Sequence, residues 1–337
     1  MINPIHSLSQ LLRKPKSKPG GCLLIKRWGA GFWSDVDMVV TYLLVAEVTK
    51  RTPVVHWGTA GPYANGHDET FELYFEPVSE INISELKGSI YPKNWNENNI
   101  LNELPFPHTN EIDEKYGMYH LCSEKRNIPS SDRKFNYLRR RQEDIVVAYC
   151  WEYADRVIAQ SKKSNRSVQD LRAETMRTKL KLRPELRKEI LRYFDKEIHG
   201  REVLGVHMRG SDKVKENSDL HRQNKKALKI AMEWVERSEN HYVYLATDSE
   251  NYASRFKECL GAERIIIRDC LRSDEEIPNF LKGSSNGYQN GYEIVLDTYI
   301  ASMCREFVGN STSNVANFVV AIGNFQDKQV HWVNVEE

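Results

Sequence analysis

Short apolar runs alternate with longer stretches in which apolar residues recur every three or four positions. Runs of the first kind are typical of buried strands, and spacing of the second kind is typical of amphipathic helices. Near the start, this pattern predicts a strand at 22–26, a helix at 36–50 capped by Ser34 or Asp35, and a second strand at 52–57. This order is a strand–helix–strand unit, as found in parallel sheets.

The middle of the chain has a different pattern of polar and apolar residues. Residues 94–132 are polar and loop-like, and helical spacing then predicts a helix over 135–164 and another over 170–198, interrupted at Pro184. His199-Gly200 breaks this pattern just before the next apolar run. We therefore place a domain boundary there.

The second half alternates regularly between strands and helices. The predicted elements are strand 203–208, helix 225–237, strand 242–246, helix 249–260, strand 264–268, helix 294–303, strand 306–308, helix 313–322 and strand 329–333. Such alternation implies a parallel, doubly wound sheet. We predict an α/β protein with a domain at 1–199 that carries a helical insert and a Rossmann-like domain at 200–337. The cleft between two such domains is the expected ligand site.

Composition narrows the function classes. The 337 residues are 40% hydrophobic and 28% charged, with a net charge of +1, which argues against a dedicated nucleic-acid binder. No apolar stretch is long enough to span a membrane, no signal-peptide core is evident, and the six cysteines form no CxxC pair. We expect a cytoplasmic protein whose basic residues 1–20 are a candidate for peripheral membrane contact.

The segment VLGVHMRGSDK, residues 203–213, carries the strongest candidate chemistry. Its strand runs directly into polar groups that include His207, Arg209 and Lys213. Ligands in open α/β sheets bind outside the carboxyl ends of the strands, and the planar guanidinium of arginine suits phosphate oxygens. The alternative is a solvated strand end with an ordinary salt bridge.

Two further clusters follow strands in the same half. Thr247-Asp248-Ser249 follows one strand, and residues 309–314 (GNSTSN), which include Thr312, open a helix after another. Hydroxyl and amide groups at a helix N-terminus form a natural phosphate seat, although simple N-capping by a serine is the alternative. Asp297 lies among apolar residues of the preceding helix, and a buried carboxylate there needs a partner such as the N–H groups of a purine.

The glycine-containing loop of the first half, RWGAGFWSD, is a weaker candidate. Gly29 and Gly31 allow a ligand or a backbone to come close, but the loop is not GxGxxG, and a tight turn packed by tryptophans explains it equally well. HExxH, GxSxG and P-loop motifs are absent from the sequence, and the histidines do not cluster with metal-ligand spacing. We expect neither a metal nor a resident cofactor.

Taken in order, these clusters resemble the fucosyltransferase superfamily, and most of all its α1,6 group of nodulation-factor and N-glycan core enzymes. GVHMRGSDK resembles the group's GVHVRRTDK, LATDS its LATDD, VLDTYIAS its ILDIHFLS, and NSTSNVA its TFSSQVC. Tyr63-Ala64 and FEPVSE are similar to its RYA and FRPVSE. The resemblance covers residues 22–80 and 203–325 and is thin between them.

This resemblance implies a GT-B-like fold, with two Rossmann-type domains facing across a cleft. It also implies an inverting, metal-independent transfer of L-fucose from GDP-fucose to a glycan hydroxyl, such as the 6-OH of a GlcNAc-type residue in a surface polysaccharide or oligosaccharide precursor. The implied partners are therefore a GDP-sugar donor and a glycan acceptor. The alternatives are transfer of another GDP-sugar, or a nucleotide-sugar-binding module without catalysis.

Residue roles follow from the same resemblance. His207 and Asp297 address the guanine, and Arg209 clamps the β-phosphate. The remaining donor-binding candidates share a place at a strand end, a helix start or the facing domain: Asp248, Ser249, Thr312, Ser313, Asn314, Gly29, Gly31 and Tyr63.

The catalytic assignments are Arg209, Lys213 and Glu216. Lys213 stabilises the departing diphosphate, which agrees with the need of a metal-free enzyme for cationic groups where charge develops. The family's base aligns with Asn217, and a slip of one residue makes Glu216 the candidate base. Gly210 replaces the family's second arginine and removes one contact from the expected set.

Overall fold

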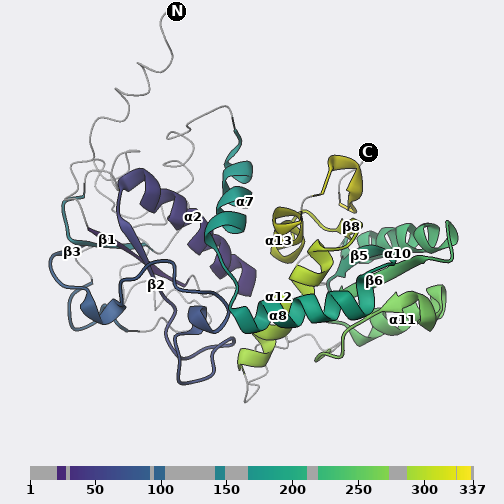
Figure 1. The fold of residues 1–337 in the computed structure, drawn as a ribbon, viewed down its shortest axis with the longest axis horizontal. Coiled ribbons are helices and arrows are strands. Elements are labelled where there is room, and N and C mark those ends of the chain that lie inside the picture. The colour runs from purple at the N-terminus through teal and green to yellow at the C-terminus, as the bar shows by residue number, and fades with distance from the viewer. Residues whose placement is uncertain are drawn as a thin grey trace, which may run out of the picture. The chain divides into compact units, whose positions relative to one another are not determined.

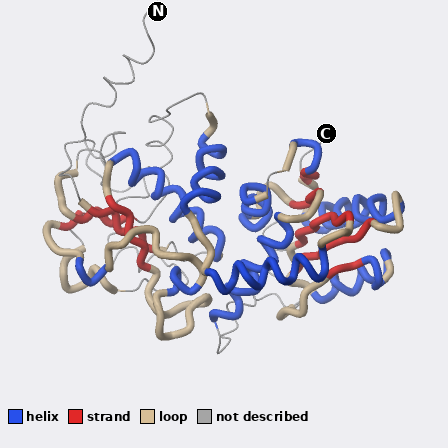
Figure 2. Tube along the Cα trace, viewed as in Figure 1, coloured by secondary structure: helices blue, strands red, loops and turns tan. Residues whose placement is uncertain are grey.

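The computed structural model describes residues 21–27, 31–91, 95–102, 141–148, 166–210, 219–272, 287–323 and 325–334. It divides into two compact units (Figures 1 and 2). The first comprises the described residues up to Gly61 and from Gly66 to Lys181, and the second comprises Pro62–Asn65 and the described residues from Leu182 onward. None of the helices in these ranges is long and apolar enough to cross a membrane.

The sheet of the first unit has four strands in the order β2-β1-β4-β3, and every pairing is parallel. Its strands are β1 (Cys22–Lys26), β2 (Thr52–His56), β3 (Ile90–Tyr91) and β4 (Ile145–Ala148). The predicted strands at 22–26 and 52–57 are confirmed.

Strand β4 corrects the helix predicted over 135–164. All four of its residues are buried, and it lies between β1 and β3. Ile145, Val146 and Val147 are β-branched, and such side chains pack well on a pleated surface that is covered on both faces. The rest of the predicted helix lies outside the described residues or in the turn before this strand.

Helix α2 (Phe32–Thr49) begins four residues before its predicted start, and neither Ser34 nor Asp35 caps it. Its N-cap is Gly31, whose carbonyl oxygen accepts the first helical hydrogen bonds. Phe32 explains the earlier start because its ring is buried against Tyr74, with centroids 4.8 Å apart. Burying a large aromatic ring is worth more than a side-chain cap.

Helix α7 (Val168–Lys179) packs along α2 in the same unit (Figure 1). Ser167 and Asp170 form a capping box at its start. It ends before Pro184, which occupies the first turn of helix α8 (Pro184–Tyr193) in the second unit. The interruption predicted at Pro184 is thus confirmed.

The second unit contains a five-stranded parallel sheet in the order β7-β6-β5-β8-β9. Its strands are β5 (Glu202–Met208), β6 (His241–Thr247), β7 (Ile265–Ile266), β8 (Glu306–Gly309) and β9 (Val330–Trp332). All five were predicted, as was the parallel doubly wound arrangement. Numbered along the chain the order is 3-2-1-4-5, which places the switch point between β5 and β8.

The remaining helices of this unit cover both faces of its sheet. They are α10 (Leu220–Glu236), α11 (Glu250–Leu260), α12 (Gly287–Ser302) and α13 (Asn314–Ile322). Leu204, Val206 and Met208 of β5 point into a core built with α10 and α11. Because side chains alternate along a strand, Val203, Gly205 and His207 face the opposite side, toward α12.

Gly205 allows α12 to approach the sheet closely. A Cβ at this position would lie 3.1 Å from the carbonyl oxygen of Ala301 and 3.3 Å from the Cβ of Cys304. A glycine within a strand thus permits a neighbouring backbone to come close. It also brings α12 next to the polar end of β5, where the candidate site lies.

Candidate active site

Arg209 and Asp248 follow the adjacent strands β5 and β6 and lie beside each other. The Nε atom of Arg209 lies 3.4 Å from Oδ2 of Asp248, and the backbone N–H of Gly210 donates to Oδ1 at 2.8 Å. The backbone carbonyl of Arg209 accepts from the side chain of Asn224 at 3.1 Å. Asp248 and Asn224 thus fix the strand end while the guanidinium remains partly exposed.

Gly210 is required by this packing. A Cβ on Gly210 would lie 2.6 Å from the Cβ of Ser249, which is closer than two carbons can approach. An arginine here, as in the resembling family, would need the start of α11 to move. The departure noted in the sequence therefore has a local structural cause.

His207 stays neutral at physiological pH. Burial and the charge of Arg209 lower the pKa of its imidazole to about 3. A neutral imidazole has one N–H donor and one acceptor nitrogen, which suits the mixed donor and acceptor edge of a nucleobase.

Asp297 has the partners that its burial demands. Its Oδ1 accepts from the guanidinium of Arg268 at 2.9 Å and from the hydroxyl of Tyr244 at 2.7 Å. Burial lowers the pKa of Arg268, but Asp297, Tyr244 and Cys270 together raise it by more, so the arginine remains charged. Tyr244 remains a neutral donor because burial and Asp297 raise the pKa of its phenol.

His207, Arg209, Asp248 and Asp297 line a cavity of about 130 Å³ within the second unit. Its walls come from the ends of β5 and β6, the segment after β7, and helices α12 and α13. The lining residues are His207, Arg209, Ala246, Thr247, Asp248, Cys270, Leu271, Asn290, Glu293, Ile294, Asp297 and Val315. Cys270 is a neutral thiol here, since burial and Asp297 raise its pKa to about 12.

The start of α13 follows β8, the strand on the other side of the switch point from β5. Ser313 caps the helix by accepting from the backbone N–H of Ala316, and this leaves its own O–H to donate. The oxygen of Asn310 accepts from the backbone N–H and hydroxyl of Thr312, at 2.9 and 2.8 Å. Asn314, the first helical residue, is exposed. Of the first-turn backbone N–H groups, that of Ala316 donates to Ser313, and those of Asn314 and Val315 are the ones suited to an anion.

The same loop is held rigid from outside. Asn310 donates to Gln223 of α10 at 2.7 Å, and Asn334 both accepts from the backbone of Ser311 at 2.8 Å and donates to its hydroxyl at 2.9 Å. Ser311 therefore serves the loop itself. These hydrogen bonds also position the candidate anion-binding groups at the start of α13.

The other predicted site residues divide into two groups. Lys213, Glu216 and Gly29 lie outside the described residues. Ser249 accepts from the backbone N–H of Tyr252 and caps α11. Gly31 is the N-cap of α2, and a Cβ added to it would meet no atom within 4 Å beyond its chain neighbours and the helix itself.

Tyr63 lies in the segment Pro62–Asn65, which packs with the second unit. Its side chain is 3% exposed. The carbonyl of Pro62 accepts from the side chain of Asn290 at 3.2 Å, and Asn290 itself lines the cavity. This segment is therefore tied to the wall of the cavity.

Sequence reasoning missed Arg268, Tyr244 and Asn290. Arg268 was predicted as the end of a strand, Tyr244 as an apolar strand residue and Asn290 as part of a loop. The usable signal was the buried Asp297, because a carboxylate within an apolar helix face demands cationic and hydroxyl donors. The residues that supply them are 29 and 53 positions away in sequence, so periodicity does not reveal them.

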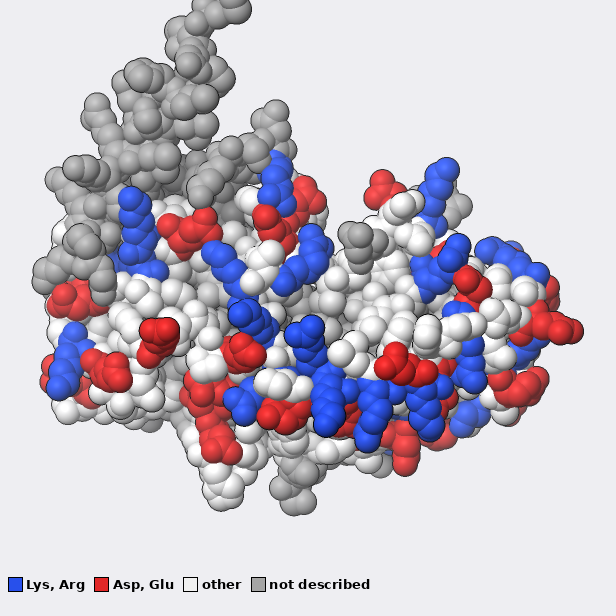
Figure 3. Space-filling view, viewed as in Figure 1, with Lys and Arg blue, Asp and Glu red and all other residues white. Residues whose placement is uncertain are grey.

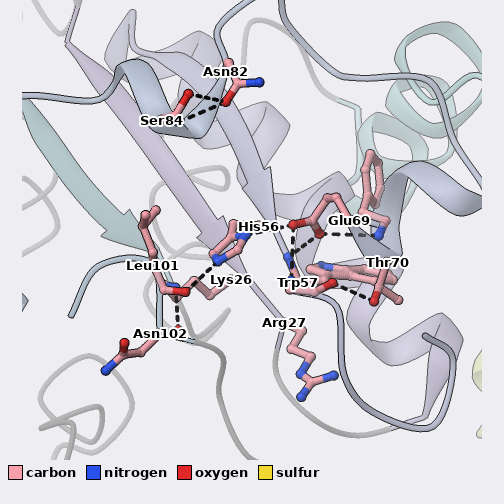
Figure 4. Close-up of polar contacts among 12 residues, drawn as sticks. Lys26, Arg27, His56, Trp57, Glu69, Thr70, Asn82, Ser84, Leu101 and Asn102 are labelled. Carbon is pink, nitrogen blue, oxygen red and sulfur yellow. Dashed lines mark hydrogen bonds and ion pairs between the residues drawn. The ribbon is translucent and has the colours of Figure 1, made fainter. Parts of the chain in front are cut away.

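The first unit also has polar side chains at the carboxyl ends of its strands (Figure 4). Glu69 accepts from the backbone N–H of Trp57 at 2.6 Å, from that of Gly58 at 3.2 Å and from the ring of His56 at 2.7 Å. The second ring nitrogen of His56 contacts the carbonyl oxygen of Leu101 at 3.0 Å. These groups hold the loops after β2 and beside β1 in place.

Comparison with known proteins shows which solved structures share this fold. No family model and no curated protein matches the sequence. NodZ α-1,6-fucosyltransferase from Bradyrhizobium is similar in structure, with a TM-score of 0.57 and 17% identity over 89% of this chain and 92% of that chain. POFUT1 in complex with GDP-fucose gives 0.54 and 13%, over 96% and 100%. The chain has the fold of these fucosyltransferases.

A variant of Arabidopsis thaliana FUT1 in complex with GDP extends the similarity, with a TM-score of 0.50 and 13% identity over 95% of this chain and 72% of that chain. The α/β, GT-B-like class predicted from the motifs is confirmed by this shared fold. Within the described ranges, no three His, Cys, Asp or Glu side chains gather into a group that could hold a metal ion.

Proposed function

We propose that the protein is an inverting, metal-independent glycosyltransferase that moves L-fucose from GDP-fucose to a glycan hydroxyl. One observation carries the proposal. His207, Arg209, Asp248 and Asp297, chosen from the sequence as a donor site, line a single cavity at the switch point of the second unit. Structures with this fold include NodZ soaked with GDP-fucose.

The donor binds with its guanine toward His207 and Asp297 and its diphosphate toward Arg209 and the start of α13. Arg209 contributes a planar fork of N–H donors, oriented by Asp248. The hydroxyl of Ser313 and the backbone N–H groups of Asn314 and Val315 add neutral donors and a favourable dipole. These groups thus offer partners for a purine at His207 and Asp297 and for negative charge at Arg209 and the start of α13.

In the reaction, the acceptor oxygen bonds to the anomeric carbon of fucose as the bond from that carbon to the β-phosphate oxygen breaks. The acceptor proton passes to a carboxylate, for which Glu216 is the candidate, and GDP leaves with the electron pair. Arg209 and Lys213 stabilise the charge that grows on the diphosphate. Attack from the opposite side inverts the anomeric configuration.

The acceptor in this proposal is a hydroxyl such as the 6-OH of a GlcNAc-type residue in a surface polysaccharide or lipid-linked precursor. In the same proposal, the N-terminal domain predicted at 1–199 is the acceptor side. A cytoplasmic location and contact of the basic residues 1–20 with a membrane belong to the same proposal. Figure 3 shows basic and acidic side chains intermixed on the face in view, in keeping with the net charge of +1.

The test is incubation of the purified protein with GDP-fucose and a panel of glycan acceptors, with and without EDTA, followed by mass spectrometry and NMR of the product. We expect a fucosylated product of inverted configuration and equal rates in both conditions. Turnover that requires a divalent ion would overturn the metal-independent mechanism.

The same assay separates the alternatives. Turnover with GDP-mannose and none with GDP-fucose would show that the donor is GDP-mannose and that the fucose assignment is wrong. Tight binding of GDP without transfer to any glycan would identify a binding module instead of an enzyme. Absence of GDP binding would remove the proposal altogether.

A further inference from the structure

The two carboxylate oxygens of Asp297 have different surroundings. Oδ1 accepts from both Arg268 and Tyr244, at 2.9 and 2.7 Å, which uses both of its lone pairs. Within the described part of the chain, the hydrogen bonds of Asp297 all reach Oδ1. The residue lines the donor cavity and is 17% exposed, so Oδ2 is the oxygen left to a ligand.

The packing around Asp297 determines which of its two oxygens accepts from the protein. Tyr244 pairs with Gly205 across β5 and β6 and points to the α12 side of the sheet, where Asp297 lies. Arg268 follows β7 and is 9% exposed, and its guanidinium also donates to the carbonyl of Glu293 at 3.3 Å. Asp297 is therefore held by donors from the middle of β6 and from the segment after β7, and it cannot turn without breaking a charged and a neutral hydrogen bond.

We propose that Arg268 and Tyr244 are positioning residues that set base specificity, because they hold Oδ1 and present Oδ2 alone to the nucleobase. A single carboxylate oxygen suits a base edge with adjacent N–H donors. Guanine offers N1–H and the 2-amino group, hypoxanthine offers N1–H only, and adenine offers an unprotonated N1 that a carboxylate repels. The inference rests on the proposed function and specifies how its site chooses the donor base.

The experiment measures binding of GDP, IDP and ADP by calorimetry to the intact protein and to variants. For the wild type we expect GDP to bind several-fold more tightly than IDP and at least about 100-fold more tightly than ADP. Tyr244→Phe should reduce the preference for GDP over ADP about fivefold, and Arg268→Gln about tenfold or more, because Asp297 is then free to turn. Arg268→Lys, which keeps the charge but loses the fork, should retain part of the preference.

Two controls separate positioning from a structural effect. Tyr242→Phe alters a tyrosine two residues earlier on the same strand, and it should leave all three affinities unchanged. In an Asp297→Asn background, Tyr244→Phe should have no further effect on the ratio of affinities. Melting temperatures of every variant establish that it is folded.

The outcomes distinguish the inference from the proposed function. If Tyr244→Phe and Arg268→Gln weaken GDP, IDP and ADP by the same factor, these residues are merely structural, and the inference is wrong while transfer of fucose can still be observed. If the wild type binds no GDP, the proposed function fails first. A change in the GDP-to-ADP ratio without loss of folding supports the inference.

Discussion

The two units place similar polar side chains at the carboxyl ends of parallel strands, yet they use them differently. In the first unit, Glu69 is surrounded by donors: two loop N–H groups and the ring of His56 lie within 3.2 Å of its oxygens. In the second unit, Asp297 and Arg209 each have one side held by the protein and another side facing a cavity.

The two regions differ in how much of each side chain's hydrogen-bonding capacity the protein itself satisfies. A buried polar group must be hydrogen-bonded, and when the protein itself supplies every partner, the group stabilises a loop. When the protein supplies partners for only part of the group, the remainder is a preorganised acceptor or donor for a ligand. The end of β2 is therefore structural, and the ends of β5 and β6 form the candidate site.

Arg209→Ala gives the strongest test of this contrast. Loss of the guanidinium removes the main cation toward the diphosphate, so we expect transfer of fucose to fall at least about 1,000-fold and GDP to bind about 30- to 100-fold more weakly. Rates are measured in a transfer assay that is corrected for hydrolysis of the donor, and affinities are measured by calorimetry. Arg305→Ala is the matched control, since Arg305 is 61% exposed and pairs with Glu202 at the opposite ends of the strands. Equal affinity of both variants for GDP would refute the assignment of Arg209.

The fold was largely predictable because its strands are short apolar runs and its helices have regular spacing. Every strand of the second unit and the interruption at Pro184 followed from those two periodicities. The helix predicted over 135–164 was wrong at β4, because a run of four buried residues looks the same in a strand or a helix. The start of α12 was missed because Gly287 and Gly291 depress helix propensity although both are buried.

The candidate site was predictable only in part. His207, Arg209, Asp248 and Asp297 stand out because polar groups interrupt apolar patterns at strand ends and in a helix. Their partners Arg268 and Tyr244 do not, because an arginine after a strand and a tyrosine within one are ordinary in sequence. Only the three-dimensional pairing of β5, β6 and β7 with α12 brings them to one carboxylate.

Glu69→Gln tests the structural half of the comparison. The amide would direct N–H groups at backbone donors that now contact a carboxylate, so we expect the free energy of unfolding of the first unit to fall by about 3 kcal/mol. Urea titration followed by circular dichroism measures this. At urea concentrations below the unfolding transition, this variant should bind GDP with wild-type affinity, because the donor cavity is lined by the second unit.

The control for this variant is Glu80→Gln, which alters an exposed glutamate of the same unit and should change stability by less than about 0.5 kcal/mol. If the two variants unfold at the same urea concentration, Glu69 does not hold the loops as described. If Glu69→Gln is folded but cannot bind GDP, the division between a structural edge and a ligand edge is wrong.

Gly210→Ala sharpens the other half of the comparison, because it asks how rigidly the end of β5 is built. The new methyl group would lie 2.6 Å from the Cβ of Ser249, and relieving that overlap should cost about 2 kcal/mol of stability and weaken GDP binding. The double variant Gly210→Ala/Ser249→Gly removes the clashing side chain, and a glycine N-cap costs only a few tenths of a kcal/mol relative to serine. Recovery of GDP affinity in the double variant checks the cause, and no recovery would contradict it.

The smallest expected effect concerns His207 and pH. Its pKa is about 3 in the folded protein against an ordinary 6.5, so between these values the unfolded chain binds more protons, and stability falls as the pH falls. Since His207 as a whole is half-buried, we expect its share to be about 1–2 kcal/mol between pH 7 and pH 5. His207→Gln should remove that share, so its urea midpoint should fall less than the wild-type midpoint over this range. His221→Gln, which replaces an exposed histidine of α10, should retain the wild-type fall. Parallel falls in the wild type and His207→Gln would mean that His207 is not held neutral, and guanine would then meet a charged ring at this edge.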